Sequence, residues 1–344
     1  MKTSLLPTGL NWYRANLHSH STLSDGKWTP ERLRDEYRRA GYSILAITDH
    51  NVLADHSDLN LPDFLLLTST EYDIMDVDHP LPMLGSAANP TLVRYLNTIH
   101  LNLFSKTPHP ADRPARRSIW GVHHNCFDGT EEEKARFSVY SRDAVNEVIR
   151  QANEAGFLVQ YNHPNWSRNV REDWLALRGV WSLEILNYAT EMLTGGEYCP
   201  YVYDDMLSYV DPGLFCSMGD DNHNRDDSDR QSFGGSTFIA APELTYDAVI
   251  RAMERGDFYC ASGRENPPRI LGLWREDDVV EIACTPATNI FFVGEGRRYG
   301  VLRGDDLTHG TFKLDPNDTW FRLAVRDRFG NTAHTHAYPA RSAG

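Results

Sequence analysis

Short apolar runs recur along the first two thirds of the chain, and helical patterns lie between several of them. Such runs are typical of buried strands, and strands that alternate with helices predict a mainly parallel sheet, either a barrel or an open doubly wound sheet. The expected strands are Ala15–Ser19, Ser43–Thr48, Phe64–Ser69, Leu81–Gly85, Ile119–His123, Phe157–Tyr161, Trp181–Leu186, Leu214–Met218 and Ser236–Ala240.

Three stretches between these runs carry helix start and stop signals. One helix is expected from Pro30, directly after the capping residue Thr29, to Ala40. The other two are Arg142–Ala155 and Thr245–Arg255, and each is followed by a glycine that ends it.

The pattern changes after Gly263. Two prolines, Pro267 and Pro268, form a stiff linker, and short β-rich runs separated by turn residues follow without any helical period. We therefore expect two domains, an α/β domain over residues 1–264 and a small all-β, sandwich-like domain over residues 265–344.

The charge balance excludes one class of partner. With 34 Lys+Arg and 48 Asp+Glu the net charge is −14, so a general nucleic-acid-binding face is not expected. Histidine is concentrated as well, because eleven of the 14 histidines lie at or before His223. Acids and histidines gathered in one part of a chain are the materials of a metal site.

The five cysteines are far apart and form no CxxC pair, which predicts a reducing compartment. Met1–Asn11 lacks the apolar core of a signal peptide, and no run approaches the roughly 20 apolar residues that span a bilayer. We expect a cytoplasmic protein with no membrane partner, and the sequence leaves its oligomeric state open.

Several of the apolar runs end in histidine or acid. The carboxyl ends of strands face the ligand crevice in α/β folds, and residues two apart on a strand face the same way. These strand-end candidates are His18, His20, Asp25, Asp49, His50, Glu71, His163, Asp221 and His223, with His79 eight residues after Glu71.

About nine candidate ligands exceed what one ion uses, because a catalytic zinc takes three protein ligands and one water. The surplus predicts two or three divalent ions that share a carboxylate, with Glu71 as the bridge and Asp49 as an acceptor behind the ligands. Ligation by His and carboxylate suits Mn, Fe or Zn. Such ions supply hydroxide at neutral pH and clamp a phosphoryl group.

Together these motifs resemble the PHP (polymerase and histidinol phosphatase) family of metal-dependent phosphoesterases. The resemblance covers roughly residues 12–264, and the small β domain behind it is similar to that of carbaryl-hydrolase-like members. It implies a distorted (β/α)7, TIM-like barrel with a trinuclear metal centre. The matching motifs are His18-Ser-His20, Ser24-Asp25-Gly26, Thr48-Asp49-His50, Glu71, Asn162-His163-Pro164 and Asp221-Asn-His223.

The resemblance also implies how the ligands divide among the ions. His18, His20, Glu71 and Asp221 would hold the first ion. Glu71, His79 and His163 would hold the second, and Asp25, His50 and His223 the third. Asp25 stands where several family phosphatases have histidine, which weakens the third site. His123 and His124 are the rival source for the ligand assigned to His79, and they otherwise face substrate.

The sequence also suggests roles for several residues outside the proposed ligand sets. Arg168 either clamps a substrate phosphate or is an exposed loop residue, and Arg225 has the same standing. Glu184 is expected to accept a hydrogen bond beneath the site. His56, His100 and His109 are expected at the surface or in packing, and no second metal site is expected at His334 and His336.

The expected function is a phosphoesterase that hydrolyses a small phosphate ester. Two alternative functions are also compatible with the sequence. The same hydroxide could attack another ester or a carbamate, and the domain could instead be a non-catalytic, metal-stabilised binding module.

Overall fold

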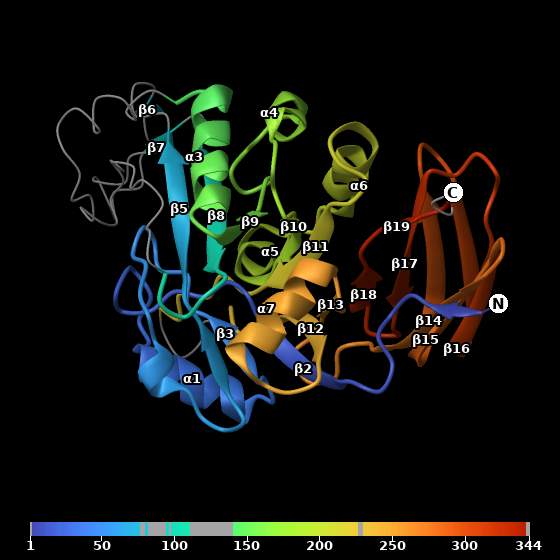
Figure 1. The fold of residues 1–344 in the computed structure, drawn as a ribbon, viewed down its shortest axis with the longest axis horizontal. Coiled ribbons are helices and arrows are strands. Elements are labelled where there is room, and N and C mark those ends of the chain that lie inside the picture. Colours follow the sequence, from blue (N-terminus) through green and yellow to red (C-terminus); the bar gives the residue numbers. More distant parts are fainter. Residues whose placement is uncertain are drawn as a thin grey trace.

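The computed structural model describes residues 2–75, 80–81, 94–95, 98–110, 140–225 and 230–341. Two sheets carry most of the fold (Figure 1). The expected strand Ile119–His123 and most of Leu81–Gly85 lie outside the described residues. Among the described residues, no helix combines the length and apolarity required to cross a bilayer.

The larger sheet has 12 strands and contains both the beginning and the end of the described chain. Its order is β1 (Thr3–Ser4), β14 (Ile270–Glu276), β15 (Val279–Gly294), β17 (Trp320–Arg326), β18 (Thr332–Thr335), β13 (Phe258–Ser262), β12 (Gly235–Ala241), β2 (Asn11–Asn16), β3 (Ile44–Ala46) and β4 (Leu65–Leu67). Outside this path, β16 (Tyr299–Lys313) pairs with β15, and β19 (Tyr338–Pro339) pairs with β17.

The second sheet has five strands in the order β11 (Phe215–Gly219), β10 (Ser182–Asn187), β9 (Phe157–Tyr161), β8 (Thr98–Ser105) and β5 (Ser69–Met75). A separate two-stranded pair joins β6 (Pro80–Leu81) and β7 (Arg94–Tyr95). The helices are α1 (Pro30–Arg39), α3 (Arg142–Glu154), α4 (Arg171–Ala176), α5 (Tyr188–Thr194), α6 (Pro200–Tyr209) and α7 (Tyr246–Arg255), with a 3-10 turn at Ser57–Leu59.

Pairing in the two sheets is mixed. Parallel ladders join β2 to β3 to β4 and β9 to β10 to β11, whereas β8 runs antiparallel to both β5 and β9. The expectation of a mainly parallel sheet is therefore wrong for β5 and β8. It is also wrong for β12, which runs antiparallel to both β2 and β13. Strand β8 went unrecognised because its apolar residues alternate with polar ones rather than forming a continuous run.

The structure confirms a mixed α/β architecture. Between the two sheets, isolated bridges join Ser19 to Asn222 and His50 to Glu71. No continuous ladder closes the two sheets into a barrel within the described ranges, so the closed barrel stays a prediction.

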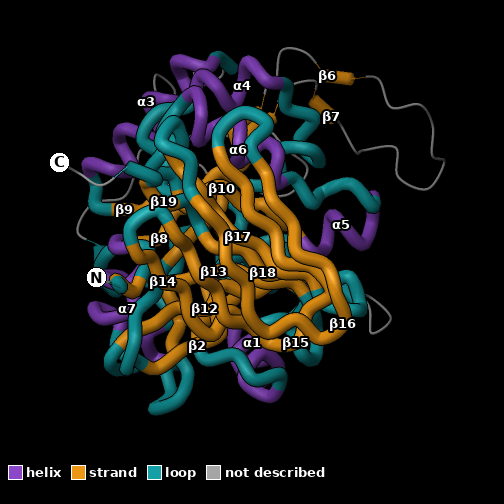
Figure 2. The backbone as a smooth tube through the Cα atoms, turned by 90° about the vertical axis from the view of Figure 1, so that its right-hand side faces the viewer, coloured by secondary structure: helices purple, strands orange, loops and turns teal. Residues whose placement is uncertain are grey.

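The C-terminal strands extend the large sheet rather than standing apart from it. Strand β18 pairs with β13 on one side and β17 on the other, with Cys260 opposite His334. Figures 1 and 2 show the long strands β14 to β17 side by side at one end of the molecule, next to the N-terminus. The large sheet is continuous across residue 264. It does not mark a domain boundary there, so the boundary stays a prediction.

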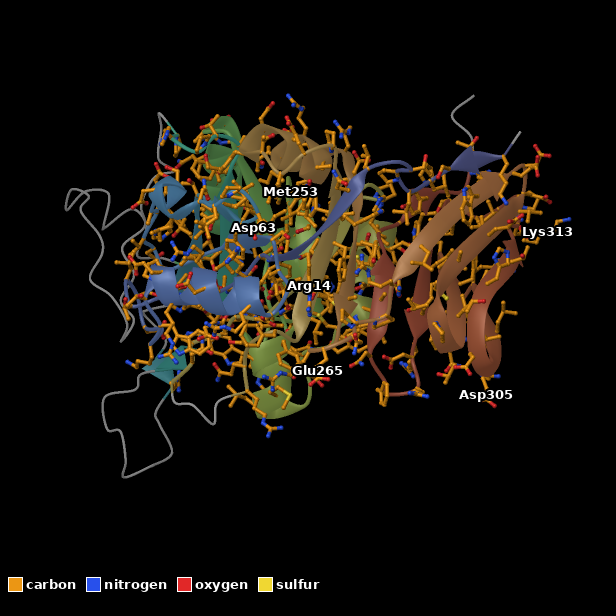
Figure 3. All side chains as sticks on the ribbon, turned by 90° about the horizontal axis from the view of Figure 1, so that it is seen from below. Arg14, Asp63, Met253, Glu265, Asp305 and Lys313 are labelled. Atoms are coloured by element: carbon orange, nitrogen blue, oxygen red, sulfur yellow. The ribbon has the colours of Figure 1, made fainter. Side chains whose placement is uncertain are left out.

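Arg14 on β2 anchors the segment that leads out of the first part of the chain. Its guanidinium donates to Ser236 Oγ at 2.8 Å and to the carbonyl oxygens of Gly263 and Arg264 at 3.0 and 3.3 Å. Figure 3 shows Arg14 in the middle of the molecule, while Asp305 and Lys313 lie at the far end of the C-terminal strands. The segment leading out of the first part is therefore anchored by a buried arginine.

A largely buried ion pair joins the C-terminal strands to α6. Arg322 on β17 is 3% exposed, and its guanidinium bonds both carboxylate oxygens of Asp204 at 2.6 and 2.8 Å. The same guanidinium lies 3.1 Å from His334 Nδ1, and Tyr198 Oη lies 2.6 Å from His334 Nε2. Removing one partner of such a pair leaves a buried charge without its counter-charge.

We expect Asp204→Asn to lower the free energy of unfolding by about 3 kcal/mol, because Arg322 keeps its charge in a buried place. Urea titration followed by circular dichroism measures the change. Asp63→Asn is the matched control. Asp63 pairs with Arg38 at an exposed position, so its substitution should change the free energy of unfolding much less. Equal effects of the two substitutions would contradict the assignment.

Candidate metal centre

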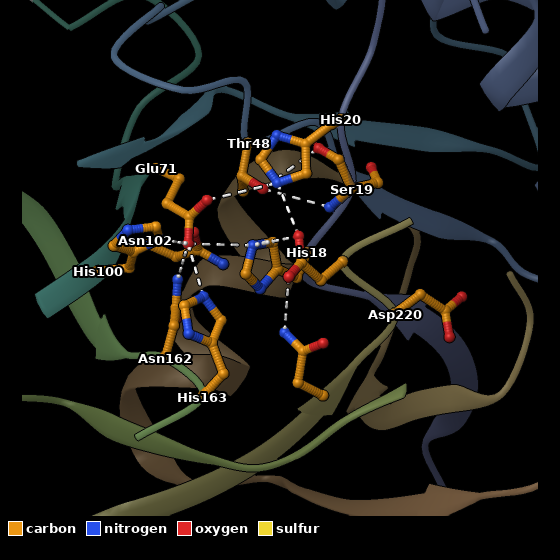
Figure 4. Close-up of polar contacts among 12 residues, drawn as sticks. His18, Ser19, His20, Thr48, Glu71, His100, Asn102, Asn162, His163 and Asp220 are labelled. Carbon is orange, nitrogen blue, oxygen red and sulfur yellow. Dashed lines mark hydrogen bonds and ion pairs between the residues drawn. The ribbon is translucent and has the colours of Figure 1, made fainter. Parts of the chain in front are cut away.

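Histidines and carboxylates from both sheets converge at one place, part of which is shown in Figure 4. They come from different stretches of the chain, and most follow directly after a buried strand. The group consists of His18, His20, Asp25, His50, Glu71, Asp73, His100, His163, Asp221 and His223.

Backbone pairing brings these strand ends into register. Beyond β2, His20 N donates to Asn222 O at 3.1 Å and Asp221 N donates to His18 O at 2.8 Å, so the ends of β2 and β11 meet. Beyond β3, the bridge between His50 and Glu71 aligns β3 with β5. The two sheets therefore place their ligand-type side chains on a shared edge.

Glu71 lies at the centre of the group and is 1% exposed. Its Oε1 is 3.1 Å from His163 Nε2, 3.2 Å from His100 Nδ1 and 3.3 Å from His18 Nε2. Its Oε2 is 3.1 Å from His50 Nδ1 and 3.3 Å from His20 Nε2. Both oxygens of one carboxylate thus face imidazole nitrogens, as a bridging ligand requires.

The potential ligand atoms form three overlapping groups, and within each group all atoms lie within 4.8 Å of one another. Glu71 belongs to two groups, and so do His20 and His50. The groups are His18, His20, Glu71 and Asp221; His20, Asp25, His50 and His223; and His50, Glu71, Asp73 and His100. This overlap suits ions that share ligands.

The buried polar atoms of the centre fit divalent ions. His18 Nε2, His20 Nε2, Glu71 Oε2 and Asp221 Oδ1 are buried and have no hydrogen-bond partner among the described residues, although they face one another. An unpartnered buried polar atom is costly, so a set of them aimed at one point fits a bound cation. Imidazole nitrogen and carboxylate oxygen are the donors that Zn, Mn and Fe accept.

Side chains behind the centre hold the ligands in place. Glu184 Oε1 lies 3.0 Å from His18 Nδ1, which leaves His18 Nε2 aimed at the group. Asn187 Nδ2 donates to Glu184 Oε2 and to Asp221 Oδ2, each at 3.0 Å. Such a carboxylate behind a histidine sets its tautomer and raises its basicity as a ligand.

Asp49 supports the loop that carries two of the ligand-type residues. It accepts from Ser21 N at 2.7 Å, from Ser21 Oγ at 2.6 Å and from Ser24 Oγ at 2.5 Å. This loop connects His20 to Asp25. Asp49 therefore lies behind the ligands as a hydrogen-bond acceptor, and it belongs to none of the three groups.

A glycine keeps room for the pair between Glu184 and His18. A Cβ atom at Gly219 would lie 2.7 Å from Glu184 Oε1 and 2.8 Å from His18 Cβ, closer than real Cβ contacts come. Two residues later, Asp221 takes a positive φ of 53°. Left-handed backbone at a non-glycine residue is strained and persists where surrounding contacts impose it.

Opposite charges of the histidines and carboxylates stabilise one another within the centre. Burial opposes a charge on His18 and His50, but the facing carboxylates outweigh it and raise the pKa of both imidazoles well above 6.5. The same balance raises the pKa of His20 to about 9. Burial likewise disfavours ionised Glu71 and Asp221, yet the histidines hold the pKa of both carboxyls below the usual range.

The structure brings together eight of the sequence-predicted ligands, which are His18, His20, Asp25, His50, Glu71, His163, Asp221 and His223. The predicted first set (His18, His20, Glu71, Asp221) is one of the three groups, and the predicted third set (Asp25, His50, His223) lies within another. His79, His123 and His124 lie outside the described residues. His163 lies against Glu71, as the second set requires.

Sequence reasoning missed two members of the centre. His100 is 3% exposed and lies 3.2 Å from Glu71 Oε1, so the expectation of a surface or packing residue is wrong. Asp73 accepts from His50 Nδ1 at 2.7 Å. Asp73 and His100 lie inside antiparallel strands. The available signal was the alternation of polar with apolar residues, because Glu71 and Asp73 are two apart on β5 and His100 lies between Ile99 and Leu101 on β8.

The other residues considered in the sequence analysis belong to none of the three ligand groups. Arg168 is exposed, with φ of 58°, in the loop after His163. His109 is exposed beside Asp55, whereas His56 is buried outside the groups. His334 contacts Tyr198 and Arg322, and His336 Nε2 lies 3.0 Å from Gly256 O.

Comparison with known proteins gives structural neighbours only. No family model matches the chain, and no curated protein matches it. Among solved structures, a two-domain protein with a predicted PHP-like metal-dependent phosphoesterase from Bacteroides vulgatus is 16% identical with a TM-score of 0.45, over 94% of this chain and 93% of that one.

Two further structures match a shorter part of the chain. A putative metal-dependent phosphoesterase from Bifidobacterium adolescentis is 17% identical with a TM-score of 0.40, over 70% of this chain and 94% of that one. An amidohydrolase from Chromobacterium violaceum with bound sulfate and no metal is 15% identical with a TM-score of 0.39, over 71% and 96%.

Glu184→Gln should weaken metal binding by roughly 10- to 100-fold, because the amide no longer fixes and polarises His18. Competition with a chromophoric chelator measures the affinity. Glu172→Gln, at an exposed position on α4, is the control and should leave the affinity unchanged. Unchanged binding by Glu184→Gln would show that this carboxylate does not support a ligand.

The metal-free protein should lose stability as pH rises from about 6.5 to about 9. A histidine whose pKa is raised on folding contributes stability that is complete below its unfolded value and lost through its folded value, here about 9 for His20. The loss for this group is on the order of 3 kcal/mol.

Thermal unfolding of chelator-treated protein across this pH range measures the effect. Carboxylates whose pKa is lowered contribute only to the acid side of the curve, so they do not mask it. The His20→Asn variant should show a shallower slope between the two pH values. A stability that is flat or rises over this range in the metal-free protein would contradict the charge pairing.

Proposed function

We propose that the protein is a PHP-type metal-dependent hydrolase that cleaves a small phosphate ester at a di- or trinuclear centre, with Mn, Fe or Zn as the candidate ions. The observation that carries the proposal is the central position of Glu71. Both of its oxygens face imidazole nitrogens from different strands, and it belongs to two of the three ligand groups. The closed barrel that this family implies is part of the same proposal.

The charge of the centre depends on the protonation of its histidines and on bound cations. Metal ligation requires neutral histidines, and in that state the four carboxylates of the centre, Asp25, Glu71, Asp73 and Asp221, would by themselves repel a phosphate group. Bound divalent ions reverse the local sign, lower the pKa of water and stabilise charge on a phosphoryl group. Their presence would make the same pocket a binding site for a phosphate ester.

The chain's own residues hold and orient this arrangement. Asn162 Nδ2 donates to Glu71 Oε1 at 2.8 Å, and Ser167 Oγ lies 3.1 Å from His163 Nδ1, so both side chains are fixed before substrate arrives. Asn187 links Glu184 to Asp221 behind the ligands. Preorganised groups of this kind cost no reorganisation during the reaction.

The proposed substrate is a small phosphorylated molecule rather than a nucleic acid. The chain carries a net charge of −14, and polymer binding requires a basic face to neutralise many phosphates. A small ester needs only the local positive charge of the centre.

Glu71→Gln should lower kcat/KM for a phosphate ester by roughly 100- to 1000-fold or more, since one neutral amide replaces the central carboxylate. Release of nitrophenol from nitrophenyl phosphate by metal-supplemented protein measures it. Asp58→Asn, at an exposed site, is the control for removal of one carboxylate.

A parallel assay with a nitrophenyl carboxylic ester and an aryl carbamate tests the proposal against its alternatives. Preference for either of these over phosphate esters would replace phosphoesterase by another hydrolase. Tightly bound metal without turnover of any ester, combined with a His20→Ala variant that alters stability alone, would point to a binding module.

A further inference from the structure

Trp166 stands beside the metal centre as a large aromatic side chain with open surface. It lies three residues after His163 and is 44% exposed. Its ring centroid is 5.1 Å from that of His163 and 5.4 Å from that of His100, and the ring planes cross at 77° and 60°. The indole therefore forms a wall directly against two residues of the centre.

The loop that carries this indole is held from several sides. Glu197, which is buried, accepts from Trp166 N at 2.5 Å and from Asn165 N at 3.2 Å. Asn165 Nδ2 donates to Gly196 O at 2.8 Å, and Tyr201 Oη donates to Asn165 Oδ1 at 2.9 Å.

The rigidity of this loop has a functional meaning. A mobile loop could present the indole in many orientations, whereas two backbone donors on one buried carboxylate fix the segment. An exposed aromatic ring on a fixed backbone loses little entropy when it meets a ligand, which favours binding.

We propose that Trp166 stacks with an aromatic ring of the substrate, so that the substrate class is aryl or arylmethyl phosphate esters. This inference rests on the proposed function. Planar rings pack on indole in offset or edge-on geometry with a gain beyond area burial alone. A ring stacked on Trp166 would lie next to a phosphate held at the centre.

The short separation restricts where the ring can sit in the substrate. Because the indole centroid is within 5.4 Å of two imidazoles of the centre, a ring one or two bonds from the ester oxygen suits this position best. In hydrolysis, the oxygen of water bonds to phosphorus and the phosphorus–oxygen bond to the aromatic alcohol breaks. One proton of the water passes to the departing oxygen.

Binding of non-hydrolysable ligands tests this assignment without reference to turnover. Calorimetry with metal-supplemented protein compares phenylphosphonate with methylphosphonate, which share the anionic head group. We expect wild-type protein to bind the phenyl compound roughly 5- to 100-fold more tightly, the range that one stacked ring provides.

Two variants of similar side-chain size separate stacking from bulk. Trp166→Phe keeps an aromatic face and should retain part of the preference, whereas Trp166→Leu should lose it and bind methylphosphonate as wild type does. Phe329→Ala removes another exposed aromatic residue, 74% exposed in the turn between β17 and β18, and should change neither affinity.

The outcomes distinguish this inference from the proposed function. Failure of both phosphonates to bind wild-type protein would overturn the phosphoesterase proposal and this inference with it. Binding of both with equal affinity, or an unchanged preference in Trp166→Leu, would overturn the inference alone. The phosphonate analogue of adenosine 5′-monophosphate, with CH2 in place of the ester oxygen, is also non-hydrolysable and holds its ring several bonds from phosphorus. If Trp166→Leu weakens only that ligand, the aryl assignment is wrong.

Discussion

The burial of one carboxylate among imidazoles governs the arrangement of this molecule. Glu71 is enclosed by His18, His20, His50, His100 and His163, which arrive from both sheets. A buried charge requires nearby counter-charges, so the strands that carry these histidines must end at one level. Two backbone contacts produce this alignment locally. One is the bridge between His50 and Glu71, and the other is the hydrogen bond from Asp221 N to His18 O.

Much of the centre was readable from sequence because its ligands use the simplest signals. His18 with His20 and Asp221 with His223 show the spacing of residues on one strand face, and His50 and His163 follow apolar runs. Asp73 and His100 do not follow an apolar run, since they lie within β5 and β8 rather than after a strand. Their place in the centre follows from the antiparallel register that sets Asp73 opposite His100, a long-range fact that local pattern does not contain.

The same limit applies to the fold. Apolar runs predicted β3, β9, β10 and β11 well, because buried parallel strands leave a continuous apolar signature. The continuity of the large sheet across residue 264 could not be read this way. It depends on pairing between β13 and β18, which are about 70 residues apart. Close to this point Arg14 anchors the chain, because its guanidinium bonds the backbone of Gly263 and Arg264. Neither contact leaves a trace in composition or periodicity.

The position of β18 between β13 and β17 has a consequence for synthesis on the ribosome. The edge of β13 remains open until residues 332–335 have emerged, although all residues of the candidate metal centre have been synthesised long before. A nascent chain thus carries an unsatisfied strand edge throughout translation of the C-terminal strands, and an open edge invites pairing with other chains. A chain that ended before this short strand would keep the residues of the candidate metal centre but would expose the edge of β13, which favours aggregation.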